Sequence, residues 1–248
     1  MKTYGLIGHP LGHSFSKGFF TDKFENEEID AEYLNFDIST IDEVLDVIAS
    51  TPTLSGFNVT IPYKEKIMPY LDEVSKEARE VGAVNVVKVE RDGTHITLKG
   101  FNSDTIGFRE SISPLLHSHH KKALILGTGG ASKAVRYVLQ QKGMDCVFVS
   151  RYTRPGTVSY KDLDADAVRE YEVIVNCTPV GMYPNENDCP MLPYEHLNNN
   201  NLLYDLVYNP ETTLFMKRGR EQGATVKNGL EMLLLQAYAS WDFWNSND

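Results

Sequence analysis

The amino-acid sequence predicts an α/β protein of two domains: an N-terminal α/β domain and a domain built on a doubly wound parallel sheet. One observation is that strand-like and helix-like segments alternate along most of the chain. A second is the turn Gly127-Thr128-Gly129-Gly130-Ala131, which follows the apolar run Ala123-Leu124-Ile125-Leu126 and precedes a helix-like segment. The third is the length of 248 residues, which is sufficient for two hydrophobic cores.

The first hundred residues form an α/β layer of their own. Arg91-Asp92-Gly93 predicts a hairpin turn into a strand over 94–99, because Asp-Gly is a strong turn signal. Asn102-Ser103-Asp104 predicts the N-cap of a helix that runs to about Leu116. The remaining expected elements are strands near 3–8, 32–38, 55–61 and 83–90 and helices near 16–26, 41–50 and 73–81. We therefore expect one domain over residues 1–103.

Residues 104–228 are expected to form the second domain. Helices or loops separate its predicted strands, as a parallel doubly wound sheet requires; these strands lie near 121–126, 146–150, 172–177, 202–207 and 224–226. The last helix, Leu230 to Trp244, is apolar nearly all round, whereas a surface helix of one domain has a polar face. We therefore expect residues 229–248 to return to the first domain and to pack across both.

The turn at Gly127, Thr128, Gly129, Gly130 and Ala131 is typical of a Rossmann-like dinucleotide-binding loop. Glycines there let the backbone approach a pyrophosphate, and the first helical turn offers free N–H groups and a favourable dipole. By itself the motif is weak, since it lacks the full G-x-G-x-x-G spacing and methyltransferases use similar turns. Its position inside a β-α-β pattern strengthens the hypothesis.

The end of the next predicted strand indicates NADP(H) as the cofactor. An NAD-preferring enzyme has an acidic residue there, about 20 residues beyond the loop, whereas this chain has Ser150 and Arg151, with Arg154 close behind. Two guanidiniums suit a 2′-phosphate. The alternative is a pair of solvated loop charges. Pro155-Gly156 then interrupts the helix expected next.

Composition excludes several function classes. The chain has 24 basic and 34 acidic residues, a net charge of −10, and no basic block, so a nucleic-acid partner is not expected. Cys146, Cys177 and Cys189 show no C-x-x-C spacing, which indicates free thiols in a reducing compartment. Neither a signal peptide nor a membrane-spanning run is recognised, and the histidines lack ligand spacing; we expect a cytoplasmic protein without a metal site.

Several polar residues could serve catalysis or binding, although each has a simpler structural explanation when it is taken alone. Lys64 follows the predicted strand Phe57-Asn58-Val59-Thr60-Ile61 and Pro62-Tyr63, which places Asn58, Thr60 and Lys64 at or near one sheet edge. The simpler explanations are an exposed lysine for Lys64, a helix N-cap for Asp104 and for Ser16 beside Ser14, and a satisfied amide for Gln236.

Read together, the motifs resemble the shikimate dehydrogenase family over nearly the whole chain. The matching stretches share both identity and order with that family. They are Ser14-Phe15-Ser16, Asn58-Val59-Thr60-Ile61-Pro62-Tyr63-Lys64, Gly82-Ala83-Val84-Asn85, Asn102-Ser103-Asp104, Gly127-Thr128-Gly129-Gly130-Ala131, Asn176-Cys177-Thr178-Pro179-Val180-Gly181-Met182, Asp205-Leu206-Val207-Tyr208-Asn209-Pro210, Gly229-Leu230 and Gln236-Ala237.

The resemblance implies roles for individual residues. It implies that Lys64 is the catalytic acid/base, accompanied by Asp104. It implies a substrate domain over 1–103, completed by the last helix, and an NADP domain between. Ser14 and Ser16, with Tyr208 nearby, would bind the substrate carboxylate; Thr60, Asn85, Asp104 and Gln236 would bind the ring hydroxyls; Gly229, through its backbone, and Met182 would contact the nicotinamide.

The implied reaction is the reversible reduction of 3-dehydroshikimate to shikimate by NADPH, a step of chorismate and aromatic amino acid biosynthesis. Two other hypotheses stay open: an NAD-using quinate/shikimate dehydrogenase, and a non-catalytic NADP-binding regulatory module. The family usually has Asn-Arg-Thr where this chain has Ser150-Arg151-Tyr152. The chain therefore departs from the family pattern where the adenosine end of the cofactor is expected to bind. The expected partner is a small molecule, and the expected state is a monomer or homodimer.

Overall fold

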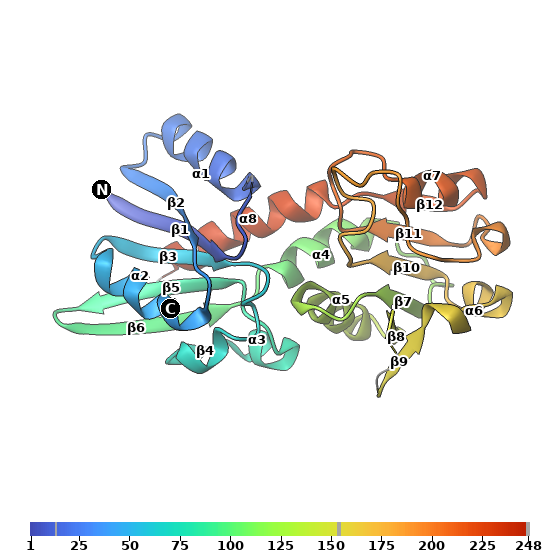
Figure 1. Cartoon of the computed structure of the whole chain (residues 1–248), viewed down its shortest axis with the longest axis horizontal. Helices are drawn as coiled ribbons and strands as arrows, with labels where there is room; N and C mark the ends of the chain where they lie inside the picture. The colour runs from blue at the N-terminus through green and yellow to red at the C-terminus, as the bar shows by residue number, and fades with distance from the viewer. Residues whose placement is uncertain (13, 153–154, 247–248) are drawn as a thin grey trace. The chain divides into compact units, whose positions relative to one another are not determined.

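The computed structural model describes residues 1–12, 14–152 and 155–246. The chain divides into two compact units (Figure 1). Unit 1 contains Met1–Ser103 and Ala237–Asp248, and unit 2 contains Asp104–Gln236. Each unit has its own sheet with helices packed against it, so the predicted α/β class is confirmed.

Unit 1 is built on a six-stranded mixed sheet with the order β2-β1-β3-β5-β6-β4. Its strands are β1 (Lys2–Gly8), β2 (Ala31–Asp37), β3 (Leu54–Val59), β4 (Glu73–Val74), β5 (Val86–Asp92) and β6 (His95–Phe101). Strands β1, β2 and β3 are parallel, whereas β5 is antiparallel to both β3 and β6. The carboxyl ends of β1, β3 and β6 and the start of β5 therefore share one edge of the sheet.

Alternation along the strands gives the sheet of unit 1 two apolar faces. Tyr4 of β1 contributes to an aromatic core with Phe20 of α1 (Phe15–Asn26) and Trp244 of α8 (Leu230–Asn245). Ile7 faces the opposite core, where α2 (Val44–Ser50) packs. Helix α3 (Lys76–Val81) and the short 3₁₀ helices Ile41–Glu43 and Met68–Tyr70 complete the unit.

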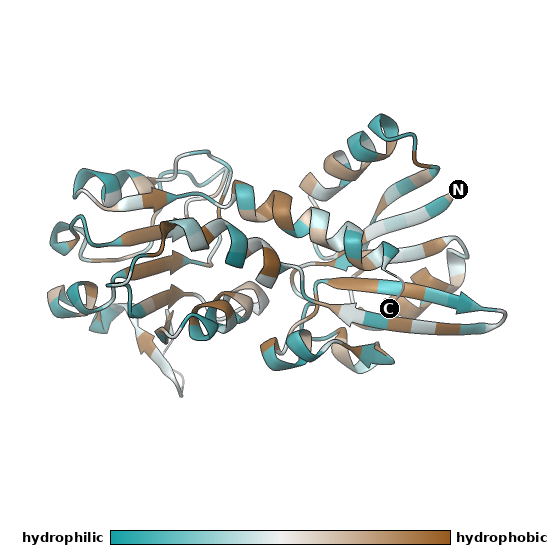
Figure 2. Cartoon of the chain, turned by 180° about the vertical axis from the view of Figure 1, so that it is seen from behind, coloured by the Kyte–Doolittle hydropathy of each residue, from teal (hydrophilic) through white to brown (hydrophobic). Residues whose placement is uncertain are grey.

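Unit 2 has a six-stranded parallel sheet with the order β12-β11-β10-β7-β8-β9. Figure 2 shows the hydrophobic colour along its central strands, as expected for strands that are buried on both faces. The strands are β7 (Lys122–Leu126), β8 (Asp145–Ser150), β9 (Thr157–Ser159), β10 (Val173–Asn176), β11 (Leu202–Asp205) and β12 (Thr225–Lys227).

Helices cover both faces of this sheet. One core contains α4 (Asp104–Ile112), α5 (Gly130–Gln141) and Met232 of α8. The other contains α6 (Ala165–Glu170) and α7 (Leu214–Glu221). The unit also contains three short 3₁₀ helices: Ser113–Leu115, Tyr160–Asp162 and Tyr194–His196. Strand order reverses between β10 and β7, and in such sheets ligands bind outside the carboxyl ends of the strands at this point.

Two predicted segments differ in the structure. The expected helix over 73–81 is wrong at its start: Glu73–Val74 form β4, and α3 begins at Lys76, because the Ser75 side chain accepts the Ala78 N–H and caps it. After β8, the short strand β9 pairs with Phe148–Ser150 where a helix is common in this fold. In the described ranges, with their gaps at 13 and 153–154, no helix has the length and apolar character needed to cross a membrane.

His120, which is 6% exposed, is expected to make unfolding pH-dependent. Its Nδ1 accepts the His117 N–H at 3.0 Å, and its Nε2 lies 3.2 Å from the Asn200 carbonyl, which fits the neutral ring. Burial, chiefly, and the nearby His119 lower the pKa of His120. Because the unfolded chain binds the proton more readily, stability should fall as the pH drops through 6.5, by at most about 1.4 kcal/mol per pH unit.

Urea titrations between pH 7.5 and 5.5 would measure this dependence. His120→Gln should have a flatter profile than the wild type, and His95→Gln, at the exposed first position of β6, should not. Equal slopes for the wild type and His120→Gln would contradict the assignment.

Candidate active site

The predicted acid/base residue lies at the shared edge of the unit 1 sheet. Lys64 is half-buried and follows the carboxyl end of β3. Its backbone is fixed on both sides: the Lys64 carbonyl accepts the Val84 N–H at 2.8 Å, and the buried Tyr63 donates its hydroxyl to the Ile38 carbonyl at 2.7 Å. The main chain that carries the Lys64 side chain is therefore held in place.

Asn85 and Thr60 lie at the same edge. The Thr60 N–H bonds the Ile7 carbonyl, and the Asn85 carbonyl accepts the Val59 N–H, so both residues are locked to neighbouring strand ends. Asn85 is 3% exposed and exchanges two bonds with Ser103, through its Nδ2 to Ser103 Oγ at 3.0 Å and its Oδ1 from the Ser103 N–H at 2.7 Å. The amide is thus oriented by the residue that directly precedes Asp104 in the chain.

Asn58, which the sequence also placed near this sheet edge, has a structural role. Its Oδ1 accepts the Tyr33 hydroxyl at 2.9 Å, and its Nδ2 donates to Ser240 Oγ at 2.9 Å. Ser240 belongs to α8, so this buried amide ties the C-terminal helix to the centre of the unit 1 sheet.

Ser14 and Ser16 lie after β1, and the simple N-cap explanation offered for Ser16 applies to Ser14 instead. Ser14, not Ser16, caps α1: its Oγ accepts the Lys17 N–H at 3.2 Å. Ser16 lies within the first turn of the helix, and both residues are half-buried. Two hydroxyls at a helix N-terminus are suited to an anionic group.

The glycine loop of unit 2 lies at the point where the strand order reverses. Gly127 follows β7 with φ +107°, and its N–H bonds the Val149 carbonyl of β8. A Cβ on Gly127 would lie 3.1 Å from the Thr178 side chain and 3.3 Å from the Cys177 carbonyl, so the loop passes closely over the end of β10. Both the backbone conformation and this approach favour glycine.

Thr128, Gly129, Gly130 and Ala131 lead into α5 with their backbone open to a ligand. Gly129 is the N-cap and provides no side-chain bond, and a Cβ on it would meet nothing within 4 Å. The N–H groups of the first turn are therefore not capped by a side chain. A phosphate group is well suited to this position.

The predicted 2′-phosphate residues are described in part. Ser150 ends β8, is 8% exposed and accepts the Tyr152 N–H through its Oγ at 3.2 Å. Arg151 is exposed, with its guanidinium 5.9 Å from the centre of the Tyr152 ring. Arg154 lies outside the described residues. Of the two predicted arginines, only Arg151 is therefore among the described residues.

Three further predicted residues of unit 2 lie on loops beyond β10, β11 and β12. Met182 is 44% exposed, in the turn after β10. Tyr208 is half-buried in the loop after β11, and burial raises the pKa of its hydroxyl. Gly229 precedes α8, and its N–H bonds the Val207 carbonyl at 3.2 Å. These loops lie on the carboxyl side of the same parallel sheet as the glycine loop.

Asp104 and Gln236 belong to helices of unit 2. Asp104 is the first residue of α4 and is 6% exposed. Gln236 is 9% exposed on α8, and its Nε2 donates to the Leu233 carbonyl at 2.9 Å. A Cβ on Gly107 would lie 2.5 Å from the Met232 carbonyl and 3.1 Å from Gln236 Cβ, so α4 and α8 touch through glycine.

These observations fit an NADP molecule along the carboxyl edge of unit 2. The uncapped start of α5 suits the pyrophosphate, Arg151 suits a 2′-phosphate, and the Met182 and Gly229 loops suit the nicotinamide end. Among the residues that the structure describes, no cluster of His, Cys, Asp or Glu has an arrangement that could hold a metal ion.

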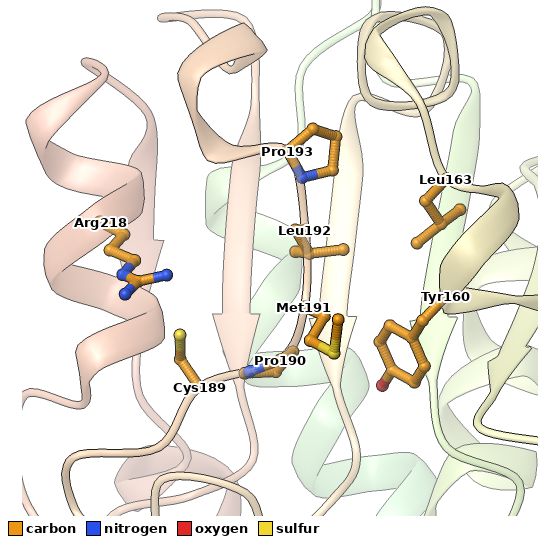
Figure 3. A pocket seen from close by; sticks show the side chains of 8 residues that line it. All are labelled: Tyr160, Leu163, Cys189, Pro190, Met191, Leu192, Pro193 and Arg218. Atoms are coloured by element: carbon orange, nitrogen blue, oxygen red, sulfur yellow. The ribbon is translucent and has the colours of Figure 1, made fainter.

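A cavity of about 360 Å³ in unit 2 involves none of the predicted residues (Figure 3). Arg218 of α7 and Tyr160 lie on opposite sides of an extended segment over 189–193. The walls are mostly apolar and lack an acid/base pair, so this cavity does not suit the chemistry of a dehydrogenase. Its lining residues are Tyr160, Leu163, Cys189, Pro190, Met191, Leu192, Pro193 and Arg218.

Comparison with known proteins assigns the family. Residues 6–87 match the shikimate dehydrogenase substrate binding domain. Over 98% of its length the chain is 37% identical to a shikimate dehydrogenase (NADP(+)) of Methanococcus maripaludis, of which 91% is covered. The chain belongs to the shikimate dehydrogenase family. A second member, from Caldanaerobacter subterraneus, is 35% identical over 98% of this chain and 91% of its own length.

Solved structures of the family have the same fold. A shikimate dehydrogenase of Aquifex aeolicus superposes with a TM-score of 0.86 at 32% identity, covering 98% of this chain and 92% of its own. The Thermus thermophilus enzyme, solved in complex with NADP(H) and shikimate, superposes with a TM-score of 0.85 at 29% identity, covering 99% of this chain and 94% of its own. Shikimate dehydrogenases thus share both the sequence motifs and the architecture of this chain.

Proposed function

We infer that this protein is an NADP-dependent shikimate dehydrogenase, which catalyses the reversible reduction of 3-dehydroshikimate to shikimate. The observation that carries this conclusion is the identity of 37% to a shikimate dehydrogenase (NADP(+)) over 98% of the chain. The reaction belongs to chorismate and aromatic amino acid biosynthesis. The substrate is a small molecule, as in the family member solved with shikimate bound.

Lys64 serves as the acid/base. When bound, NADPH supplies a hydride to the ketone carbon of the substrate. The Lys64 ammonium gives a proton to the oxygen as the C=O bond becomes a C–O bond, and in the reverse direction the Lys64 amine takes that proton back. The fixed backbone around Lys64 supports this role, because an acid/base group must stay within hydrogen-bond reach of the reacting oxygen.

The remaining predicted residues orient the substrate. Ser14 and Ser16, with Tyr208, bind the carboxylate, and the start of α1 adds a favourable helix dipole. Thr60, Asn85, Asp104 and Gln236 bind ring hydroxyls; the bonds between Asn85 and Ser103 support this role by fixing the Asn85 amide. We also assign Asp104, together with Lys64, to the catalytic residues.

We assign the substrate domain to residues 1–103 with the C-terminal segment from 229, and the NADP domain to 104–228. The match of residues 6–87 to the substrate binding domain of the family supports the first assignment. The uncapped glycine loop at α5 supports the second. The three cysteines are free thiols, which supports a cytoplasmic location. We propose that the protein is a monomer or homodimer.

An absorbance assay tests the function. Purified protein should oxidise NADPH when 3-dehydroshikimate is added and reduce NADP⁺ when shikimate is added. Quinate with NAD⁺ should give a much lower kcat/KM. Equal or better turnover of quinate with NAD⁺ would instead assign the quinate/shikimate dehydrogenase activity, and no turnover with any pair would leave a non-catalytic NADP-binding module.

Removal of the charge at Arg151 is expected to weaken the binding of NADPH but not that of NADH. Because hydrogen bonds between charged groups contribute about 1.5–3 kcal/mol, Arg151→Gln should raise the KM for NADPH by about 10- to 100-fold. The KM for NADH, which has no 2′-phosphate, should change by less than about twofold. Arg154→Gln is expected to act in the same direction.

A matched variant controls for the loss of a positive charge in the same unit. Arg169 pairs with Asp166 on α6, at the other end of the sheet from Arg151, so Arg169→Gln should leave both KM values unchanged. If Arg151→Gln raised both KM values equally, Arg151 would not hold the 2′-phosphate.

A further inference from the structure

Two buried polar side chains face each other where β10 and β11 end. Asn176 and Asp205 are the last residues of these strands and are paired in register. Both are fully buried, and Asn176 Nδ2 donates to Asp205 Oδ1 at 2.9 Å. The loops that carry Met182 and Tyr208 begin directly after this pair.

The Asp205 carboxylate accepts hydrogen bonds on both oxygens. Its Oδ1 also accepts the Val207 N–H at 3.0 Å, and its Oδ2 accepts the hydroxyl of Thr213 at 2.7 Å. Thr213 is itself buried and caps α7 by accepting the Met216 N–H. One carboxylate therefore joins the ends of two strands, a loop and a helix start.

The hydrogen bonds continue into the loops on the cofactor side of the sheet. Asn176 Oδ1 accepts the Thr178 N–H at 3.1 Å and its hydroxyl at 2.6 Å, which shapes the turn that leads to Met182. The carbonyl of Val207, whose N–H bonds Asp205, accepts the Gly229 N–H at 3.2 Å. The Tyr183 N–H bonds the Asn209 carbonyl at 3.1 Å, so the two loops are also joined to each other.

We infer that Asp205 is a positioning residue, whose carboxylate holds the loops after β10 and β11 so that Met182, Gly229 and Tyr208 can receive the nicotinamide and the substrate. The inference rests on the proposed dehydrogenase function. A buried carboxylate lowers stability relative to an apolar residue of similar volume unless its bonds compensate. Here the donors to the carboxylate are Asn176, Val207 and Thr213. Asn176 begins the segment that leads to Met182, and Val207 directly precedes Tyr208 and accepts the Gly229 N–H through its carbonyl.

The test separates the two ends of the cofactor. Asp205→Ala should lower kcat/KM for shikimate oxidation with NADP⁺ by about 10²-fold, because a displacement of about 1 Å in positioning groups has effects of that size. Binding of adenosine 2′,5′-bisphosphate, which lacks the nicotinamide, should stay within about threefold of the wild type because the α5 and Arg151 loops are untouched. Asp205→Ser should show the same pattern if the alanine variant does not fold.

Asn201→Ala is the matched control. Asn201 is 3% exposed at the opposite end of β11, where its Nδ2 donates to the Val168 carbonyl. This variant should lose stability but keep kcat/KM and bisphosphate affinity. Equal loss of kcat/KM in the Asn201 and Asp205 variants, or normal turnover in Asp205→Ala, would overturn the inference. If the wild type did not reduce NADP⁺ with shikimate, the proposed function would fail first.

Asp205→Asn keeps the Oδ1 acceptor but cannot ionise, so turnover should recover to within about threefold of the wild type.

Burial raises the pKa of Asp205 from 3.8 to about 6 in the folded chain. The stability that the protonated carboxyl contributes is present below pH 3.8 and is lost as the pH rises through about 6. The wild type should therefore lose stability between pH 4 and 7, whereas Asp205→Asn should not. The melting temperature of Asp205→Asn minus that of the wild type should rise over this range; a constant difference would overturn the assignment of a buried, ionising carboxylate.

Discussion

Replacement of Lys64 by alanine is expected to lower turnover by about 10²-fold or more while the protein stays folded. Hydride addition to a ketone leaves negative charge on oxygen, and removal of the proposed proton donor leaves water to perform the transfer. The fold should tolerate the change, because Lys64 is half-buried and its segment is held by the buried residues Tyr63 and Ile67. Steady-state kinetics in both directions and a thermal melt would measure the two effects.

Lys66 offers a matched control. It lies two residues beyond Lys64, is exposed, and places its ammonium 6.0 Å from the centre of the Tyr63 ring. Lys66→Ala removes the same charge from the same turn and should keep turnover within about twofold, as surface substitutions usually do. Near-normal turnover in Lys64→Ala, or an equal loss in both variants, would remove Lys64 from the mechanism.

Most of the regular elements could be predicted because each has a strong local signal. Apolar runs and alternation locate the principal strands of both sheets, and Arg91-Asp92-Gly93 locates the hairpin between β5 and β6. Strands β4 and β9 were not predicted: β4 lies in a segment for which the sequence predicts a helix, and β9 directly follows Pro155-Gly156. Their existence depends on pairing with β6 and β8, which is a tertiary property.

The site was predictable to a different extent. The glycine loop at Gly127 follows from local chemistry, because its turn, its positive φ and the uncapped helix start are all encoded within a few residues. The roles of Ser14, Thr60 and Lys64 depend instead on the family resemblance, since each has a common structural explanation. The bonds of Asp205 to Asn176 and Thr213 were not predictable, because they join positions 29 and 8 residues apart through strand register.

Gly229→Ala is expected to lower kcat/KM by about 10²-fold. A Cβ on Gly229 would lie 2.1 Å from the Leu206 carbonyl oxygen, 2.6 Å from its carbon and 3.0 Å from Leu206 Cα. All three are backbone atoms, so no side-chain rotation relieves the overlap, and the loop after β11 must move by about 1 Å to restore ordinary contact. Displacements of that size in a positioning loop lower rates by about 10²-fold.

The same overlap should lower the free energy of unfolding by about 1–3 kcal/mol, as overpacking of a buried site usually does. Gly18→Ala controls for the substitution itself: Gly18 lies in α1, where a Cβ would meet nothing within 4 Å, and alanine should stabilise that helix by about 0.5–1 kcal/mol without a change in kcat/KM. Urea titration and steady-state kinetics on both variants measure these effects. The displaced loop carries Tyr208 and the Val207 carbonyl that binds Gly229, so kcat/KM should fall for the substrate and for NADPH together. A Gly229→Ala enzyme with kcat/KM within about threefold of the wild type would show that this loop positions neither of them.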